Sequence, residues 1–216
     1  MPAVRLTPAA LKFGRFDVMG FDAEAPPKFV RHVGLASDAG ETAVDGPAVE
    51  LLEMGPPLGK GIEKPQCAGH VPLTVEEENR INLFVEEQVL EHQAAQLRRW
   101  KGYIVHPHVK PHEADDGTVI YHLYSCAGFV VEAYRATEID VVVTENENLP
   151  LISLKSLLPA YEGIENHPDL RAEFGIPGDG PWPVLMPGYV LRALARPTEE
   201  IRNVPYQPLA GDELFE

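Results

Sequence analysis

The first third of the chain has short apolar runs that end at turn residues. Residues 32–37 form a β-branched run that opens on a histidine, and residues 48–54 form a second apolar run. Gly, Pro and Asp residues bound both runs, which predicts two strands joined by a connection longer than a two-residue turn. Residues 1–31 predict an extended lead-in, and residues 59–72, rich in Gly, Pro and Lys, predict a loop.

A helical period follows these strands. Thr74-Val75-Glu76-Glu77 has the sequence of a capping box, in which Thr74 accepts a hydrogen bond from the third backbone N–H and Glu77 reaches back to the cap. The pattern predicts a helix from residue 74 to about Trp100 that is unusually acidic. Its apolar positions recur at helical spacing along one stripe, which consists of Ile81, Phe84, Val85, Val89 and His92.

The second half of the chain has shorter elements. Residues 102–117 predict a loop, residues 118–124 an extended run, and the segment from Cys126 to Tyr134 an amphipathic helix. Beyond it we expect, in order, a strand at 139–144, short helices at 153–161 and 168–174, two strand pieces at 184–194, and a frayed polar tail from Arg196.

Length and charge narrow the picture. The 216 residues suit one domain, and we expect residues 1–176 to form it, with residues 177–216 as a C-terminal extension packed on it. The chain has 18 Lys and Arg against 33 Asp and Glu, a formal net charge of −15. Phosphate binding needs clustered cations, so this charge argues against nucleic acid and against an anionic membrane surface as partners.

The cysteines and the hydropathy predict the compartment. Cys67 and Cys126 are too few for a disulfide framework, and free thiols are expected. No stretch has the length of a membrane span, and the N-terminal residues lack the apolar core of a signal peptide. The sequence therefore predicts a cytoplasmic protein with no membrane span, and nothing in it indicates a cofactor.

Cys126 is the most informative residue because it stands where a helix begins. Helix N-termini carry partial positive charge and unpaired N–H groups, which favour the thiolate over the thiol. A thiolate attacks acyl carbon, but it needs a base within hydrogen-bond reach and a polar group that orients this base. His167 lies in a turn or at a helix start, so His32, at the start of a strand, is the better candidate for the base.

Two carboxylates compete for the orienting position. Glu50 and Glu53 lie on the strand expected to follow the His32 strand. In a regular strand they point to opposite faces, with Glu53 on the face of Val49 and Leu51.

This order of segments resembles the circularly permuted branch of the NlpC-like papain-fold cysteine hydrolases, which includes the lecithin:retinol acyltransferase relatives. The resemblance covers roughly residues 30–160. It is carried by Arg31-His32-Val33-Gly34-Leu35, by Val49-Glu50-Leu51-Leu52, by Tyr121-His122-Leu123-Tyr124-Ser125-Cys126-Ala127-Gly128-Phe129-Val130, and by Leu149-Pro150-Leu151-Ile152-Ser153 with a short helix after it.

The resemblance implies an α+β fold with a papain-like core in permuted order, in which an antiparallel sheet packs on the nucleophile-bearing helix and one long helix. It implies Cys126 as nucleophile, His32 as base and Glu50 as orienting residue, since Glu50 matches the family position better than Glu53. The substrate would be an amide or ester of a peptide, a peptidoglycan-derived compound or a lipid. The Cys126 N–H and a second donor, for which Tyr124 is a guess, would hold the oxyanion.

Other readings of the same residues stay open. Cys126 is also compatible with a small buried hydrophobe, and the acidic surface with a binding or assembly protein that is no enzyme. A metal-dependent enzyme is a third alternative, because four histidines and two aspartates crowd residues 106–122 and Cys67-x-x-His70 has ligand spacing. Zinc needs about four converging ligands, and no second pair has tidy spacing, so a His-rich surface loop is favoured. The sequence leaves the oligomeric state open.

Overall fold

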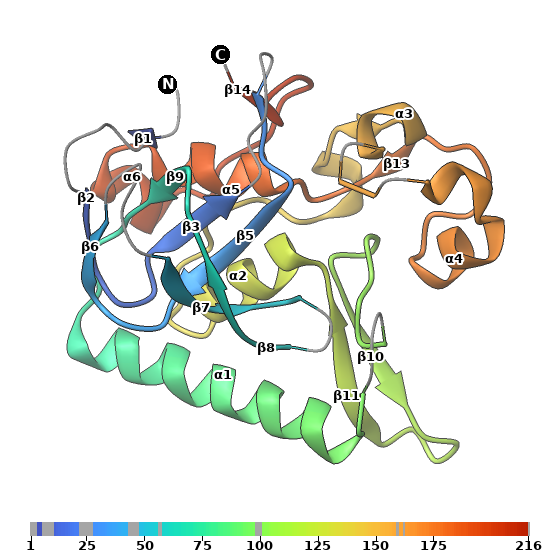
Figure 1. The fold of residues 1–216 in the computed structure, drawn as a ribbon, viewed down its shortest axis with the longest axis horizontal. Helices are drawn as coiled ribbons and strands as arrows, with labels where there is room; N and C mark the ends of the chain where they lie inside the picture. The colour runs from blue at the N-terminus through green and yellow to red at the C-terminus, as the bar shows by residue number, and fades with distance from the viewer. Residues whose placement is uncertain are drawn as a thin grey trace.

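The fold was analysed in a computed structural model, which describes residues 4–5, 11–21, 28–42, 48–55, 58–97, 101–158, 160–161 and 163–215. Its centre is an antiparallel six-stranded sheet (Figure 1). In spatial order the strands are β1 (Val4–Arg5), β9 (Cys67–Gly69), β3 (Val18–Phe21), β5 (His32–Ala36), β7 (Val49–Glu53) and β8 (Gly59–Glu63).

The two strands predicted at residues 32–37 and 48–54 are confirmed as β5 and β7, and they pair side by side. The loop predicted at 59–72 is wrong, since it contains β8 and β9. The sequence of β8 does not alternate between apolar and polar residues. It is an edge strand, whose side chains are mostly exposed, so it needs no apolar face. Two short ladders flank the sheet, namely β2 (Leu11–Phe13) with β6 (Gly40–Thr42), and β4 (Lys28–Phe29) with β14 (Leu214–Phe215).

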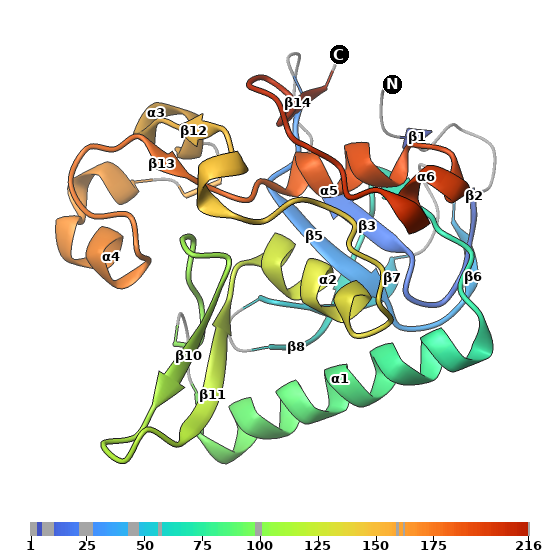
Figure 2. The ribbon, with the colours of Figure 1, turned by 180° about the vertical axis from the view of Figure 1, so that it is seen from behind.

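Helices cover one face of this sheet (Figures 1 and 2). α2 (Cys126–Arg135) packs on β5 and β7, and α5 (Pro187–Leu194) packs on β3 and β9. The main core lies between them and includes Val18, Val33, Leu35, Leu52, Phe129, Val130, Tyr189 and Val190. A smaller apolar cluster occupies the opposite face and consists of Met19, Phe21, Ala36, Val49, Leu51 and Ala68, with Phe13 packed on it.

The long helix α1 (Val75–Ala94) begins at the predicted capping box. Glu77 N–H donates to Thr74 Oγ1, and the Glu77 carboxylate accepts from the Thr74 N–H. Ala95 caps its C-terminus, so the helix is shorter than the predicted end near Trp100, and residues 98–100 lie outside the described residues. The predicted stripe is turned inward, with Ile81, Val85 and His92 buried.

The second half of the chain differs more from the prediction. Part of the expected loop at 102–117 is β10 (Val109–Glu113), which forms a hairpin with β11 (Val119–Tyr124). The strand expected at 139–144 is wrong, since only an isolated bridge joins Val142 to Tyr206 there. The short elements that follow are η1 (Asn146–Asn148), β12 (Leu151–Ile152), α3 (Leu154–Leu157), η2 (Ile164–Asn166), α4 (Pro168–Glu173) and β13 (Trp182–Pro183).

The C-terminal segment corrects two predictions. The strand pieces expected at 184–194 are mainly the helix α5, because Pro187, which the sequence places in a turn between them, instead opens the helix. Seven of the eight residues of α5 are buried. The tail from Arg196 is not frayed: it forms α6 (Thr198–Asn203), and Arg202 of this helix pairs with Glu77 at the start of α1. Residues 177–215 are therefore built into the same core as the sheet.

The fold is α+β, as expected, with an antiparallel sheet packed on the Cys126 helix. Among the helices of the described ranges, none combines the length and the apolarity that a bilayer span needs.

Candidate active site

Cys126 is the first residue of α2, as the sequence predicts. Ser125 caps the helix through a hydrogen bond from the Gly128 N–H to its side chain. The Ser125 N–H donates to the carbonyl oxygen of His108, and this oxygen lies against the first turn of α2. A Cβ atom on Gly128 would lie 2.0 Å from this oxygen, so the turn that presents Cys126 requires glycine there.

His32, the first residue of β5, contacts both Glu53 and Cys126. His32 Nε2 lies 2.7 Å from Glu53 Oε2, and the imidazole also hydrogen-bonds the Cys126 side chain. The side chains of His32 and Glu53 are 24% and 14% exposed, so the pair is shielded from solvent without being sealed off. A thiol, an imidazole and a carboxylate thus stand in contact in the order that a cysteine nucleophile with a base and an orienting group requires.

The structure does not bring Glu50 to this site. Its carboxylate accepts from the Ser37 hydroxyl at 2.9 Å and from Lys60 Nζ at 2.7 Å, and its side chain is 43% exposed. The strand register gives the reason. Leu35 pairs with Leu52, so alternation places His32 and Glu53 on one face of the sheet and Glu50 on the other. Glu53 takes the place that the family resemblance gives to Glu50.

The contacts shift the proton equilibria of the pair. Burial lowers the pKa of His32, but its hydrogen bonds to Cys126 and Glu53 outweigh burial and raise the pKa to about 10. Burial raises the pKa of the Cys126 thiol, whereas His32 and the N–H groups of Val33 and Ala127 lower it, and the net shift is downward. Both shifts favour a thiolate–imidazolium ion pair at neutral pH.

A tyrosine other than the predicted one faces the sulfur. The Tyr124 hydroxyl is buried and donates to Gln88 Oε1 on α1 at 2.9 Å, away from Cys126. Tyr103 instead hydrogen-bonds the Cys126 side chain and the Tyr161 hydroxyl. Burial raises the pKa of Tyr103 well above its usual value, so its hydroxyl keeps its proton and is a donor. Sequence reasoning missed Tyr103, because it lies in the loop predicted at residues 102–117, where only histidines and aspartates suggested chemistry.

The sulfur lies at the bottom of a narrow crevice. Cys126 is 3% exposed, and the crevice above it leaves about 10 Å³ of free space, close to what one water molecule needs. Its wall comes from five parts of the chain: the segment from β4 to the start of β5, the segment around Val105, the start of α2, the α3 region and the segment that leads into α5. The lining side chains are Phe29, Arg31, Val105, Ser125, Leu157, Ala160, Tyr161, Val184, Leu185, Met186 and Pro187.

The histidines considered as metal ligands are held by other partners. His108 lies 3.2 Å from Glu132, His122 lies 3.1 Å from Glu91, and His112 stacks on Tyr121. In the described part of the chain, no three His, Cys, Asp or Glu side chains come together as a metal ion would require. Cys67 and Cys126 are both free thiols, as predicted.

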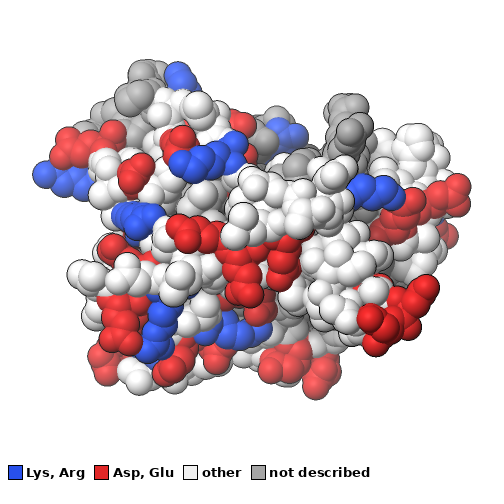
Figure 3. Space-filling view, turned by 90° about the horizontal axis from the view of Figure 1, so that it is seen from below, with Lys and Arg blue, Asp and Glu red and all other residues white. Residues whose placement is uncertain are grey.

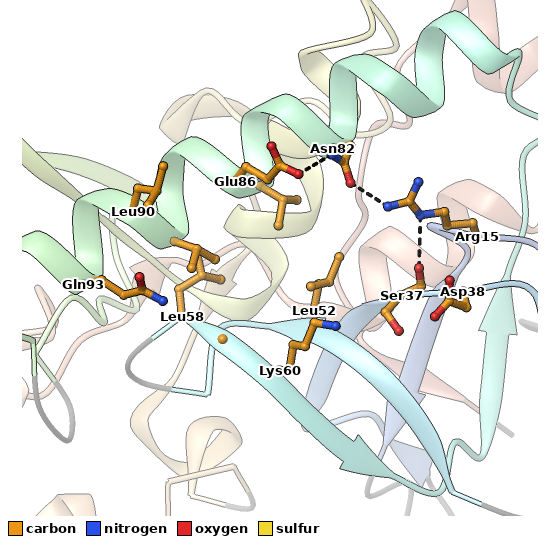
Figure 4. A pocket seen from close by; sticks show the side chains of 13 residues that line it. Arg15, Ser37, Asp38, Leu52, Leu58, Lys60, Asn82, Glu86, Leu90 and Gln93 are labelled. Atoms are coloured by element: carbon orange, nitrogen blue, oxygen red, sulfur yellow. Dashed lines mark hydrogen bonds between the residues drawn. The ribbon is translucent and has the colours of Figure 1, made fainter.

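A wider groove lies elsewhere, between α1 and the β7–β8 edge (Figure 4). It encloses about 690 Å³, and neither Cys126 nor His32 lines it. At one end Arg15 donates to the Ser37 carbonyl and to Asn82 Oδ1 (Figure 4). The face of the molecule that α1 borders carries many Asp and Glu side chains, with a few Lys and Arg between them (Figure 3).

Comparison with known proteins identifies no relative: neither a family model, nor a curated protein, nor a solved structure matches the chain.

Proposed function

We propose that the protein is a cysteine-dependent hydrolase or acyltransferase that cleaves amide or ester bonds through a thioester. The observation that carries this proposal is the contact of Cys126 with His32, and of His32 with Glu53 at 2.7 Å. A structural cysteine needs neither an imidazole on its sulfur nor a carboxylate behind that imidazole.

The order of the segments supports a permuted papain-like arrangement. The histidine strand and the carboxylate strand are neighbours in one antiparallel sheet, and the cysteine helix follows them in the chain and packs on both. This is the order on which the resemblance to the NlpC-like branch rests. The peptide, peptidoglycan-derived and lipid substrates that the resemblance suggests belong to this proposal.

The proposed reaction has two stages. The Cys126 thiolate adds to the acyl carbon, and the oxyanion that forms accepts hydrogen bonds from the Tyr103 hydroxyl and from a backbone N–H at the start of α2. The C–N or C–O bond then breaks, and the leaving group takes a proton from the His32 imidazolium. In the second stage His32 takes a proton from water or an acceptor, whose oxygen or nitrogen attacks the thioester. The acyl product leaves, and the sulfur regains its thiolate form.

Labelling with iodoacetamide tests the proposal, because only the thiolate reacts. Cys126 should react at pH 6 much faster than the buried Cys67, which serves as an internal control in the same chain. Mass spectrometry of the two tryptic peptides reads the rates separately. The wild type should also hydrolyse p-nitrophenyl esters, and the C126S variant should not, while C67S keeps the activity. Equal and slow labelling of both thiols, without ester hydrolysis, would favour the alternative of a binding protein that is no enzyme.

A further inference from the structure

A second tyrosine hydroxyl lies behind the one that faces the sulfur. Tyr161 follows α3 and lines the crevice above Cys126. Its hydroxyl hydrogen-bonds the hydroxyl of Tyr103, which in turn hydrogen-bonds the Cys126 side chain. Two oxygen atoms and one sulfur atom thus form a chain of hydrogen bonds that ends at the nucleophile, and the proposed reaction uses only the inner of the two hydroxyls.

The protons of this chain have one favoured arrangement once the thiolate has formed. Each phenol has one proton to donate, and burial raises the pKa of both tyrosines, so both hydroxyls keep that proton at neutral pH. The thiolate has no proton and, as an anion, is the strongest acceptor of the three groups. Tyr103 therefore donates to the sulfur, and its oxygen accepts a hydrogen bond from Tyr161.

The rings of both tyrosines pack on Phe174, the residue that follows α4. The ring centroid of Phe174 lies 5.4 Å from that of Tyr103 and 6.2 Å from that of Tyr161, and the two tyrosine rings are themselves 6.2 Å apart. The three rings meet in tilted or edge orientations, which aromatic pairs favour. Removal of the Tyr161 oxygen alone keeps this packing, so the effect of the hydroxyl can be measured apart from that of the ring.

We propose that Tyr161 is a positioning residue, whose hydroxyl donates to the Tyr103 oxygen and so directs the Tyr103 proton toward the sulfur and then toward the oxyanion that forms beside it. This inference rests on the proposed function, in which Tyr103 donates to the oxyanion. A hydroxyl that accepts one hydrogen bond is polarised and becomes a stronger donor of its own proton. A donor that is already oriented also needs no reorganisation when negative charge develops on the substrate.

Tyrosine-to-phenylalanine variants test the inference, because they remove one oxygen and keep the ring. Y103F should lower kcat for p-nitrophenyl acetate by roughly 100-fold, as the loss of an oxyanion donor does. Y161F should lower it by roughly two- to tenfold, the factor that corresponds to one hydrogen bond, with KM nearly unchanged. Y134F is the matched control and should keep the wild-type kcat. Tyr134 is fully buried on the same helix as Cys126, and its hydroxyl donates to the Phe16 carbonyl instead.

The double variant Y103F/Y161F separates positioning from a purely structural role. If Tyr161 acts through Tyr103, its hydroxyl has no effect once that of Tyr103 is gone, and the double variant should match Y103F within about 1.5-fold. If Tyr161 only supports the fold, the two losses should multiply.

The pH profile of Cys126 labelling gives a second readout that a structural role would not move. The thiolate should form at a higher pH in Y161F than in the wild type, because weaker donation to the sulfur raises the thiol pKa. Y103F should shift the profile further in the same direction, and Y134F should leave it in place.

The outcomes separate this inference from the proposed function. Turnover that depends on Cys126 but is unchanged in Y161F overturns the role of Tyr161 alone. The same holds if the losses multiply in the double variant, if Y161F leaves the labelling profile in place, or if Y103F keeps full activity, since Tyr161 would then have no donor to position. Absence of turnover together with slow labelling of Cys126 overturns the proposed function, and the role of Tyr161 with it.

Discussion

Gly61 on β8 leaves the space in which the Glu53 carboxylate reaches His32. A Cβ atom at position 61 would lie 1.8 Å from Glu53 Oε1, a distance at which one of the two must move. The carboxylate is the far end of a flexible side chain, so it moves more readily than the strand. The contact between His32 and Glu53 thus depends on a residue of the neighbouring strand that touches neither the thiol nor the imidazole.

The G61A variant should fold and lose the orienting contact. With Glu53 displaced, the His32 pKa should fall and labelling of Cys126 at pH 6 should slow several-fold, because the imidazolium that stabilises the thiolate is weakened. Gly55 provides the matched control. A Cβ atom there would lie 3.5 Å from the same Glu53 oxygen, an ordinary contact, so G55A should keep the wild-type rate. The idea fails if G61A and G55A label alike.

Separate substitution of Glu53 and of Glu50 distinguishes the roles of the two carboxylates. E53Q should reduce kcat for ester hydrolysis by roughly 10- to 100-fold, in the range seen when a group that supports an active-site histidine is lost. E50Q removes a carboxylate of the same strand whose partners are Ser37 and Lys60, and it should leave kcat within about twofold. Steady-state kinetics of both variants decides the point. A larger loss in E50Q than in E53Q would return the orienting role to Glu50.

The pH dependence of labelling follows from the two shifted pKa values. The Cys126 pKa lies below the ordinary thiol value of 9.0 and the His32 pKa lies at about 10, so the ion pair exists between them. The labelling rate should rise with pH as the thiolate forms, below the ordinary thiol pKa of 9.0, and should then stay nearly level up to the range in which His32 loses its proton, near pH 10. In H32Q this rise should move upward toward the ordinary thiol range, with a loss of roughly tenfold in rate at pH 7 for each unit of displacement. An unchanged profile in H32Q would show that His32 does not set the thiolate population.

The contact between α6 and α1 should contribute to stability in a pH-dependent way. Arg202 contacts both Glu77 oxygens, at 2.7 and 3.0 Å, and this pairing lowers the Glu77 pKa to about 2 from 4.5. A carboxylate with a lowered pKa stabilises the fold above its unfolded pKa and loses this effect as the pH falls through its folded pKa. R202M should therefore lower the free energy of unfolding by ~1 kcal/mol at pH 7. The difference from wild type should shrink between pH 4.5 and 2.

Urea unfolding at several pH values measures this difference. R80M is the control, because the pair of Arg80 with Glu76 is more exposed and should contribute less. A difference between R202M and wild type that stays constant down to pH 2 would contradict the assignment.

The sequence was sufficient to predict the elements whose signals are local. The capping box predicts the start of α1, and the apolar runs predict β5 and β7. The helix that begins at Cys126 follows from its own amphipathic period. The failures concern elements whose stability comes from distant neighbours. The segment of α5 contains Pro187 and Gly188, which are typical of turns, whereas in the structure Pro187 opens the helix and the sheet and α2 pack against it.

The structure brings Glu53 rather than Glu50 to His32, and Tyr103 rather than Tyr124 to Cys126, for geometric reasons. Alternation already separates Glu50 from Glu53, but only the pairing of β5 with β7 decides which of the two shares a face with His32. Tyr103 is brought to Cys126 by a parallel bridge to Tyr124, the residue proposed from sequence for the oxyanion. The tyrosine that reaches the sulfur thus lies on the segment that pairs with Tyr124. The spacing of residues along the sequence does not show which segments pair in the fold.

The position of α5 also has a consequence for biosynthesis. The strands β3 and β9 belong to the N-terminal third of the chain, yet the helix that covers them comes from its last quarter. While the ribosome is still translating, this face of the sheet has no permanent cover, and its apolar side chains depend on transient contacts or on chaperones. A protein shortened before Pro187 should accordingly aggregate rather than form a smaller version of the same domain.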